Sequence, residues 1–281
     1  MEIKPLDSGT FLEFPGKKIH GFLFNAMREA NEEISEQVHK LPDLKPFTVS
    51  PIFGTRYGKP TPIEKEKTYR MRVTFLEDKI FELFTTKVMR DRILKKTFRI
   101  GSIEFLITKV ILDQTRSYWA SVFSPKDYIK ENTELRKEIT LSFVTPTLFR
   151  IGDLHLSKPD AEKTYVGLLK KFNKYSDVKI DESIVEELKK IRIVKDDTNE
   201  KKVFFENFYL QGFVGDVTFS IDNLSGEANE DVSKELLTTF NILSEFAFYS
   251  GVGYKTTMGL GQTKITRPEE ERRRNYNDDG R

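Results

Sequence analysis

A glycine-rich segment near the end of the chain constrains this sequence more than any other feature. Residues 250–261 read Ser-Gly-Val-Gly-Tyr-Lys-Thr-Thr-Met-Gly-Leu-Gly, and they lie between an amphipathic helix predicted over 232–248 and a short strand predicted over 262–266. The glycines let backbone amides approach a phosphate chain closely, while Lys255 adds a cation and Tyr254 a ring for stacking. The segment follows a helix and enters a strand, whereas Walker loops and dinucleotide-binding loops open a helix, so it is neither of these. A glycine-rich turn without a ligand is the alternative interpretation.

The length and the composition indicate a protein with two folded domains. Its 281 residues correspond to two domains of typical size, which is roughly 150 residues each. Hydrophobic residues make up 38% of the chain and charged residues 32%, which is typical of a globular protein with a highly charged surface. The formal net charge of +2 provides no overall attraction to nucleic acid, so any such interaction depends on a local basic patch.

The sequence contains no cysteine and only three histidines, which are His20, His39 and His155. The absence of cysteine excludes disulfides, iron–sulfur clusters, zinc ribbons and thiol nucleophiles. The histidines are too scattered for a zinc site, so we expect neither a metal nor a cofactor. No apolar run approaches the roughly 20 residues that span a bilayer, and the charged start of the chain does not have the pattern of a signal peptide. We therefore expect a cytoplasmic protein that does not interact with membranes.

Apolar periodicity predicts an α+β arrangement in the first half of the chain. Residues 18–30 have the spacing of an amphipathic helix, and Asn31 followed by two glutamates predicts the cap of a second helix over 32–40. Strands are predicted over 47–53 and 68–75, a helix capped by Asp78 over 78–92, and a hairpin over 98–113 around Gly101. This order indicates a sheet with its helices on one face.

The second half repeats the same kinds of elements without a repeat at the level of residues. The polar segment 125–136 predicts a linker, followed by a strand over 138–143 and helices over 160–175 and 181–190. A pair of strands is predicted over 203–221, broken at Gly212 and Gly215, before the helix over 232–248. Residues 267–281 are almost free of apolar side chains and predict a disordered tail. We therefore expect domains over 1–125 and 126–267, and a charged tail over 268–281.

The glycine-rich segment resembles the C-terminal G-loop of the CRISPR-associated RAMP proteins, in which two Gly-hydrophobic-Gly triplets are separated by a five-residue insert. Within that superfamily the sequence is most similar to the repeat-cleaving endoribonuclease, the sixth Cas protein. Three further stretches resemble the same family, at residues 20–26, 143–149 and 212–215. The resemblance covers the chain from about residue 16 to 267. It implies an α+β fold of two tandem ferredoxin-like domains with antiparallel sheets and a C-terminal glycine-rich loop.

The resemblance also implies an activity, which is cleavage of CRISPR precursor RNA within each repeat without a metal. In that reaction the ribose 2′-hydroxyl attacks the adjacent phosphate, which leaves a 2′,3′-cyclic phosphate and a 5′-hydroxyl. The protein must supply a base, an acid and a cation for the phosphorane. The implied partner is CRISPR repeat RNA, and the family also allows other Cas proteins of an interference complex and a second copy of the chain as partners.

His39 and Lys45 match the family's pattern of a histidine, a six-residue step to a lysine, and then an aromatic residue and a threonine. The resemblance therefore implies proton transfer at His39 and a cation at Lys45. The alternative for His39 is an exposed histidine favoured by the dipole at a helix end. The tyrosine of the family's first helix corresponds to Phe24, which cannot exchange a proton. The site is thus a two-residue centre or contains a substitute for the tyrosine.

His20 is the natural substitute, because it lies one helical turn before Phe24 and on the same face. In one unbroken helix His20 and His39 would be about 28 Å apart, at roughly 1.5 Å per residue. A chain reversal at Asn31 would instead return both histidines toward the same end. The alternative is that His20 serves packing or capping at the start of the helix.

The residues expected to bind RNA come from two segments. The glycine-rich segment contributes Gly251, Gly253, Tyr254, Lys255, Gly259 and Gly261, and a second basic segment contributes Arg56 and Lys59. His155 has no motif around it and is interpreted as a structural or surface residue.

Two other functions are compatible with the sequence. One is a RAMP protein that holds repeat RNA without cutting it, which Phe24 favours; the other is an unrelated α+β nucleic-acid-binding domain.

Overall fold

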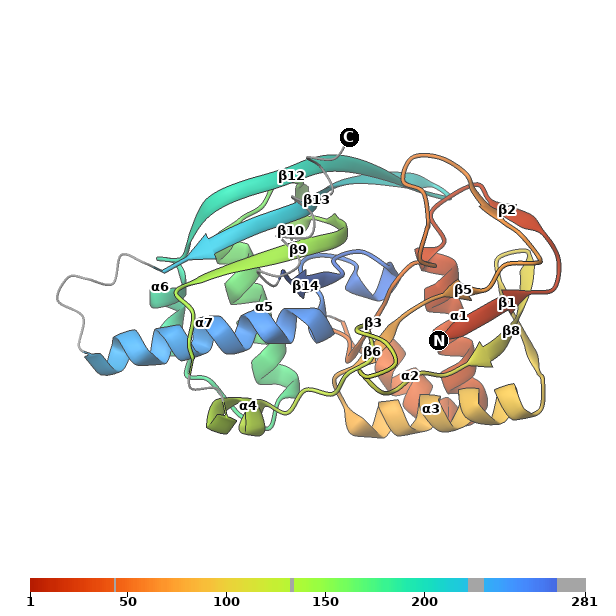
Figure 1. The fold of residues 1–281 in the computed structure, drawn as a ribbon, viewed down its shortest axis with the longest axis horizontal. Helices are drawn as coiled ribbons and strands as arrows, with labels where there is room; N and C mark the ends of the chain where they lie inside the picture. Colours follow the sequence, from red (N-terminus) through yellow and green to blue (C-terminus); the bar gives the residue numbers. More distant parts are fainter. Residues whose placement is uncertain (43, 132–133, 222–229, 267–281) are drawn as a thin grey trace.

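The computed structural model describes residues 1–42, 44–131, 134–221 and 230–266, which form two α+β halves lying side by side (Figure 1). The elements of the N-terminal half are β1 (Glu2–Pro5), β2 (Gly9–Phe11), α1 (Gly16–Ala30), α2 (Glu32–Lys40), β3 (Phe47–Val49), β4 (Thr61–Ile63), β5 (Tyr69–Arg70), β6 (Val73–Phe75), α3 (Asp78–Ile93), β7 (Thr97–Ile100), β8 (Ile103–Lys109) and α4 (Pro125–Glu131). The C-terminal half consists of β9 (Glu138–Thr147), β10 (Phe149–Ile151), β11 (Leu154–Leu156), α5 (Ala161–Tyr175), η1 (Glu182–Ile184), α6 (Val185–Leu188), β12 (Arg192–Phe205), β13 (Phe208–Ser220), α7 (Glu230–Ser250), η2 (Thr256–Met258) and β14 (Thr263–Ile265).

The N-terminal half contains a four-stranded antiparallel sheet in the order β5–β1–β8–β7. Strand β3 pairs with β6, and only Met71 and Arg72 separate β6 from β5. The chain after β3 continues along β5, because the Ser50 and Phe53 amides donate to the carbonyl oxygens of Arg72 and Arg70, each at 2.8 Å. The strands therefore run β3, β5–β6, β1, β8 across the half. With a helical segment after β1 and α3 after β6, this is the βαββαβ order of a ferredoxin-like domain.

The C-terminal half has the same topology in a clearer form. Its four-stranded antiparallel sheet has the order β12–β13–β9–β14, with α5 after β9 and α7 after β13. Figure 1 shows these two helices on one face of the sheet. Their apolar sides and the inner face of the sheet form one large core, in which Tyr165, Phe219 and Phe240 are fully buried. The predicted class, two tandem ferredoxin-like domains, is confirmed.

The reversal of the chain at Asn31 follows from local chemistry. The Asn31 backbone is extended, so helix α1 ends there, and its amide donates to the Met27 carbonyl at 2.8 Å. The Asn31 side chain then accepts from the Ile34 amide at 3.0 Å, which caps helix α2 as predicted. The two helices consequently pack antiparallel, with the apolar side of α1 on the core of the N-terminal half.

The strand pair predicted over 203–221 is present, but the predicted position of the break between its strands, at Gly212 and Gly215, was wrong. The hairpin turns at Glu206 and Asn207, its first strand begins at Arg192, and both Gly212 and Gly215 lie inside β13. These glycines mark close approaches of other backbone rather than breaks. A Cβ atom at Gly212 would lie 2.6 Å from the Thr147 carbonyl oxygen, and one at Gly215 would lie 2.3 Å from that of Asp197. The exposed, polar sequence of β12 concealed the strand because little of it packs on the core.

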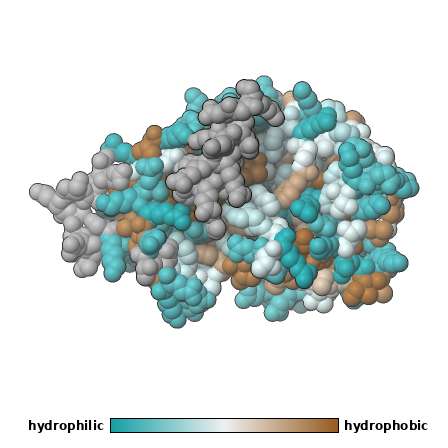
Figure 2. Space-filling view, in the orientation of Figure 1, coloured by the Kyte–Doolittle hydropathy of each residue, from teal (hydrophilic) through white to brown (hydrophobic). Residues whose placement is uncertain are grey.

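Other predicted boundaries need smaller corrections. Asp78 is the first residue of α3 and Glu77 is its cap, and the segment expected to be a linker contains helix α4. The strand predicted over 68–75 is interrupted between β5 and β6, and the helix predicted over 181–190 consists of the 3-10 turn η1 and the four-residue helix α6. The other predicted helices and strands are present with ends shifted by a few residues. The predicted tail over 267–281 lies outside the described residues. On the face shown in Figure 2, hydrophilic residues predominate and hydrophobic residues form small separate patches.

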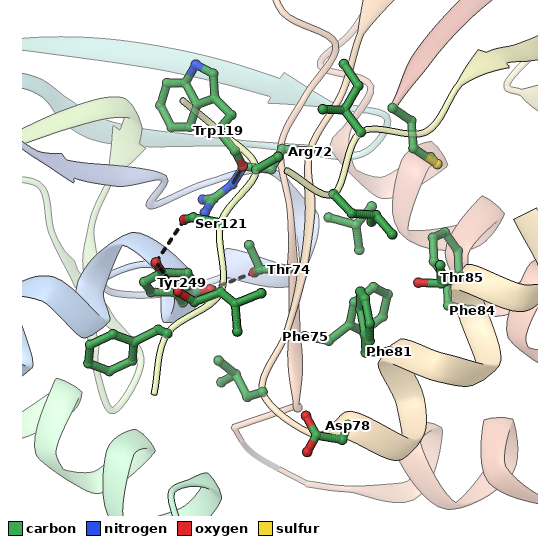
Figure 3. Close-up of a pocket in the computed structure, with 18 of the residues that line it drawn as sticks. Arg72, Thr74, Phe75, Asp78, Phe81, Phe84, Thr85, Trp119, Ser121 and Tyr249 are labelled. Atoms are coloured by element: carbon green, nitrogen blue, oxygen red, sulfur yellow. Dashed lines mark hydrogen bonds between the residues drawn. The ribbon is translucent and has the colours of Figure 1, made fainter. Parts of the chain in front are cut away.

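A buried arginine joins the two halves. Arg72, between β5 and β6, donates to the carbonyl oxygens of Trp119 at 2.9 Å and Phe248 at 2.6 Å, and its guanidinium lies 3.8 Å from the centroid of the Phe248 ring. Burial lowers the pKa of Arg72 to about 9, so it stays charged at neutral pH. Figure 3 shows Arg72, Trp119, Ser121 and Tyr249 on one side of a cavity of about 870 Å³, opposite Phe75, Phe81 and Phe84.

A second junction lies where the β12–β13 hairpin reaches over the N-terminal half (Figure 1). Phe14 donates its amide to the Phe204 carbonyl at 2.8 Å, and its ring packs against Tyr57 and Phe205. Leu260 of the glycine-rich segment is fully buried in the same small core. This junction therefore brings the glycine-rich segment against the start of helix α1.

Candidate active site

Helices α1 and α2 bring two of the three histidines against one aromatic ring. The centroid of the Phe24 ring lies 4.8 Å from that of His20 and 5.3 Å from that of His39. The rings of His20 and Phe24 also pack against Phe47, at 5.8 and 5.6 Å. The chain reversal at Asn31 thus places His20 and His39 close together, although they lie on different helices.

His20 is held by the glycine-rich segment 250–261, here called the glycine loop. Its Nδ1 atom lies 2.9 Å from the Thr257 carbonyl oxygen. A carbonyl oxygen only accepts hydrogen bonds, so Nδ1 carries the hydrogen and the Nε2 lone pair of neutral His20 is left free to accept a proton. Burial is the main cause that lowers the pKa of His20; the Thr257 hydrogen bond opposes this, and the charges of Lys45, His39 and Lys255 add to it. The protein therefore favours the neutral imidazole.

Lys45 has a structural task that the sequence did not predict. Its ammonium donates to the carbonyl oxygens of Val38 and His39 at 2.9 Å and of Leu41 at 3.0 Å. These carbonyls end helix α2, so Lys45 caps the helix that carries His39 and compensates its dipole. The ammonium also lies 5.9 Å from the centroid of the Phe24 ring. Burial, and then the charge of Lys174, lower the pKa of Lys45.

The glycines close the glycine loop on itself. Gly251, Gly259 and Gly261 are buried with positive φ, and a Cβ atom at Gly261 would lie 2.0 Å from the Val252 carbonyl oxygen. Several amides of the loop are used inside the protein: Val252 donates to Gly261 at 2.9 Å and Tyr254 to Leu148 at 2.8 Å. Solvent reaches the exposed Gly253 and the half-buried Tyr254 and Lys255, and also the half-buried Thr257 and Met258.

Aromatic and cationic side chains gather around that exposed part of the loop. The Tyr254 ring stacks on His155 with centroids 5.6 Å apart, and the Arg150 guanidinium also lies 5.6 Å from it. Lys255 places its ammonium 4.9 Å from the Tyr254 ring and 5.5 Å from Phe208. The exposed aromatic side chains at the neighbouring tip of the β12–β13 hairpin are Phe204, Phe208 and Tyr209. His155, for which the sequence contained no motif, is thus an exposed neighbour of the glycine loop.

The second predicted basic segment lies beside the same hairpin. Arg56 and Lys59 are exposed in the loop between β3 and β4. A Cβ atom at Gly58 of this loop would lie 3.8 Å from the Lys202 carbonyl oxygen and 3.9 Å from the Phe204 ring. The structure therefore brings this segment close to the hairpin tip and leaves its cations in solvent.

Among the described residues, no group of three or more His, Asp or Glu side chains is arranged to hold a metal ion. In the same part of the chain, none of the helices has the length and apolar character needed to cross a membrane. The cavity of Figure 3 is a separate feature, because His20, His39 and Lys45 do not line it.

Two ferredoxin-like domains whose glycine loop contacts the first helix define a RAMP-type protein. Comparison with protein families narrows this class. A model described as the CRISPR Cas6 N-terminal domain matches residues 3–129, and one described as the CRISPR-associated endoribonuclease Cas6 matches residues 141–263. The chain belongs to the Cas6 family.

Solved structures agree on the fold. A Cas6 of Thermus thermophilus in a product complex is 22% identical, with 94% of this chain and 98% of that chain covered and a TM-score of 0.76. A second Cas6 product complex is 24% identical, with coverage of 95% and 98% and a TM-score of 0.72. A RAMP protein described as binding different RNA substrates is 13% identical, with coverage of 95% and 98% and a TM-score of 0.60. No curated protein matches the sequence.

Proposed function

We propose that this protein is an endoribonuclease that cuts CRISPR precursor RNA once within each repeat, in the cytoplasm and without a metal. One observation carries the proposal: two imidazoles pack against a single aromatic ring, and one of them is fixed in a defined tautomer by the glycine loop. Membership of the Cas6 endoribonuclease family supplies the substrate class. Two imidazoles are sufficient for a reaction in which the ribose 2′-hydroxyl is the nucleophile.

The two histidines divide the proton transfers between them. His20 is the base, because the Thr257 carbonyl leaves the lone pair on its Nε2 atom and burial favours the neutral imidazole, and it takes the proton of the 2′-hydroxyl. The exposed His39 is the acid that protonates the leaving 5′-oxygen. The products are a 2′,3′-cyclic phosphate and a 5′-hydroxyl. His20 thereby takes the place of the tyrosine that Phe24 replaces.

Lys45 and Lys255 supply the positive charge for the phosphorane. The hydrogen bonds of Lys45 to three carbonyl groups leave its charge to act through space rather than by direct contact. Lys255 is half-buried in the glycine loop, and its charge already lowers the pKa of His20, so it lies within electrostatic range of the site. A preorganised cation next to a developing negative charge favours the transition state over the substrate.

The surface around the glycine loop is the proposed path of the RNA. Gly253, Tyr254 and Lys255 belong to its accessible part, and the buried Gly251, Gly259 and Gly261 shape it. The exposed rings of the hairpin tip offer stacking faces, and Arg56 and Lys59 extend the positive charge beyond the tip. Other Cas proteins and a second copy of the chain are further proposed partners.

The test is cleavage of end-labelled CRISPR repeat RNA in EDTA by the wild type, His39→Ala and His20→Ala. We expect the wild type to make a single cut that disappears when the ribose at the cut site is 2′-deoxy. Each histidine variant should lose on the order of a hundredfold or more in rate, which is typical of a lost acid or base. His155→Ala is the matched control in single-turnover reactions with saturating protein: His155 lies outside the ring cluster, and its stacking on Tyr254 affects RNA binding rather than proton transfer. A cut that needs a divalent metal, or that survives both substitutions, would contradict the proposal.

Phe24 supports a second candidate function, a Cas6 protein that holds repeat RNA without cutting it. Its ring packs against both histidines but carries no hydroxyl that could exchange a proton. This function requires tight binding of repeat RNA without a cut by the wild type, and a gain of cutting in Phe24→Tyr. A wild type that cuts removes this candidate.

A further inference from the structure

The last two turns of helix α5 carry three polar side chains on one face. Lys171, Lys174 and Tyr175 are spaced by three and four residues, so they lie on the same side of the helix. Helix α5 belongs to the C-terminal half, whereas His20, His39 and Lys45 belong to the N-terminal half. Lys174 and Tyr175 contact the N-terminal half directly, and Lys171 contacts the glycine loop that holds His20.

Lys171 fixes the glycine loop from behind. It is 6% exposed, and its ammonium donates to the Ser250 carbonyl at 2.7 Å and lies 3.4 Å from the Thr256 hydroxyl oxygen. It thereby ties the end of helix α7 to the start of η2. The next residue, Thr257, presents the carbonyl that holds His20. Burial lowers the pKa of Lys171 to about 8, which shows how far this cation is removed from water.

Tyr175 and Lys174 fix the segment that carries Lys45. The Tyr175 hydroxyl donates to the Leu44 carbonyl, and the Lys174 ammonium donates to the same oxygen at 3.2 Å. Leu44 has a φ of +45°, a left-handed conformation that is unfavourable for leucine and that surrounding contacts must maintain. The following residue is Lys45, which caps the helix of His39. The two contacts thus hold the Leu44 conformation that directs Lys45 to its three carbonyls.

We propose that this face of helix α5 positions the active site of the other domain, with Lys171 acting through the glycine loop on His20 and Tyr175 acting through Leu44 on Lys45. Neither residue touches the reacting atoms, so both are positioning residues. The expected effect of these residues on the cleavage rate rests on the proposed ribonuclease function. The expected effect of Lys171 on the tautomer of His20 does not depend on that function.

The first arm of the test compares Lys171→Met with Lys170→Met, the exposed neighbour on the same helix. Histidines labelled with nitrogen-15 are followed by NMR, and the signals are assigned with His20→Gln. In the wild type we expect His20 to show the tautomer with hydrogen on Nδ1. In Lys171→Met its signals should shift toward the mixed tautomers of a free imidazole, while His155 serves as an internal reference. Lys170→Met should match the wild type.

The second arm compares Tyr175→Phe with Tyr165→Phe, which removes a buried hydroxyl from the same helix that bonds only to Ser244. Single-turnover cleavage and RNA affinity are measured for these two variants and for Lys171→Met. We expect Tyr175→Phe to lose about tenfold in rate, and Lys171→Met between about tenfold and a hundredfold, with affinity within about twofold of the wild type. Tyr165→Phe should lower the melting temperature and leave the rate unchanged.

The outcomes distinguish a failure of the proposed function from a failure of the positioning role of helix α5. A wild type that does not cut overturns the proposed function, while the NMR arm still decides whether Lys171 holds His20. A wild type that cuts, with unchanged rates and an unchanged His20 tautomer in both variants, overturns the inference alone. A loss of rate in Tyr165→Phe as large as in Tyr175→Phe would also overturn it, because the effect would then be one of stability.

Discussion

At the level of single residues, the candidate active site depends on a neutral His20. The imidazole is half-buried among aromatic rings, and the charges of Lys45 and Lys255 act on it from two segments of the chain. Protonation would place a further positive charge in that environment. The protein therefore favours the form of His20 that accepts a proton, and it does so at the expense of stability in acid.

This leads to a prediction for the pH dependence of stability. The pKa of His20 is lower in the folded protein than in the unfolded chain, where it is near 6.5, so the unfolded chain binds more protons between these two values. Stability is therefore greatest above the unfolded pKa and falls as the pH drops through the folded pKa. Melting temperatures measured from pH 8 to pH 5 should fall more steeply for the wild type than for His20→Gln. Equal slopes, or a change only in the control His155→Gln, would contradict this.

The sequence identifies some residues of the site and cannot identify others. His39, Lys45 and His20 were predicted, since imidazole and ammonium groups are visible in any sequence and the first two fit a family pattern. The Thr257 carbonyl could not be predicted, because it is a backbone group 237 residues from His20 and every residue has one. The same holds for Lys171, because the exposed Lys170 and Lys174 of the same helix do not distinguish it by residue type.

At the level of elements, helix α1 is anchored by its first residue. Gly16 lies so close to the glycine loop that a Cβ atom there would be 1.8 Å from the Met258 carbonyl oxygen. This contact fixes the start of the helix that carries His20 against the loop that holds it. Gly21 lies in the interior of the same helix and has no atom within 4 Å of its Cβ position.

We predict opposite effects for Gly16→Ala and Gly21→Ala. Overpacking at position 16 should destabilise the protein by about 1–3 kcal/mol and displace the helix from the glycine loop. Alanine at position 21 should stabilise it by about 0.5–1 kcal/mol, since glycine is a poor helix former. Thermal unfolding gives both values, and roughly 2–4 °C is expected for each kcal/mol in a protein of this size. A Gly16→Ala variant as stable as the wild type would show that the helix start is not anchored there.

Element prediction from sequence succeeded where one side of an element is buried and failed where neither is. Helices α1, α3, α5 and α7 each have an apolar side on a core, so their periodicity is visible. Most of β12 is exposed, and the strand is held by backbone hydrogen bonds to β13. Because these bonds involve only the backbone, they do not produce an apolar pattern in the sequence. The glycines of β13 suggested a turn because their actual role, close contact with neighbouring backbone, is a tertiary property.

At the level of the whole molecule, Arg72 couples the stabilities of the two halves. Its hydrogen bonds end on Trp119 and Phe248, and it also lies 3.4 Å from the Gln262 side chain, so one residue of the N-terminal half links a connecting segment and the C-terminal half. Removing it would leave buried carbonyl groups without donors, at a cost of about 1–3 kcal/mol for each.

The prediction is a loss of cooperativity in Arg72→Met. Trp119 is the only tryptophan of the chain, and it stacks on Phe248 at this junction, so its fluorescence reports on the contact between the halves. Urea unfolding followed by fluorescence and by circular dichroism should coincide in the wild type and separate in the variant, with the fluorescence change first. Arg70→Met, which removes an exposed ion pair with Glu2, is the control. Coincident transitions in Arg72→Met would argue against this coupling.

The position of the glycine loop along the chain has a consequence for biosynthesis. A ribosome releases His20 and His39 early and Thr257 late, and domains generally fold in that order during translation. A nascent chain, or a fragment cut between the halves, therefore carries both imidazoles but lacks the carbonyl that orients one of them. Under the proposed function, the ability to cut RNA appears only after Thr257 has been synthesised, so products truncated before this residue cannot process repeats.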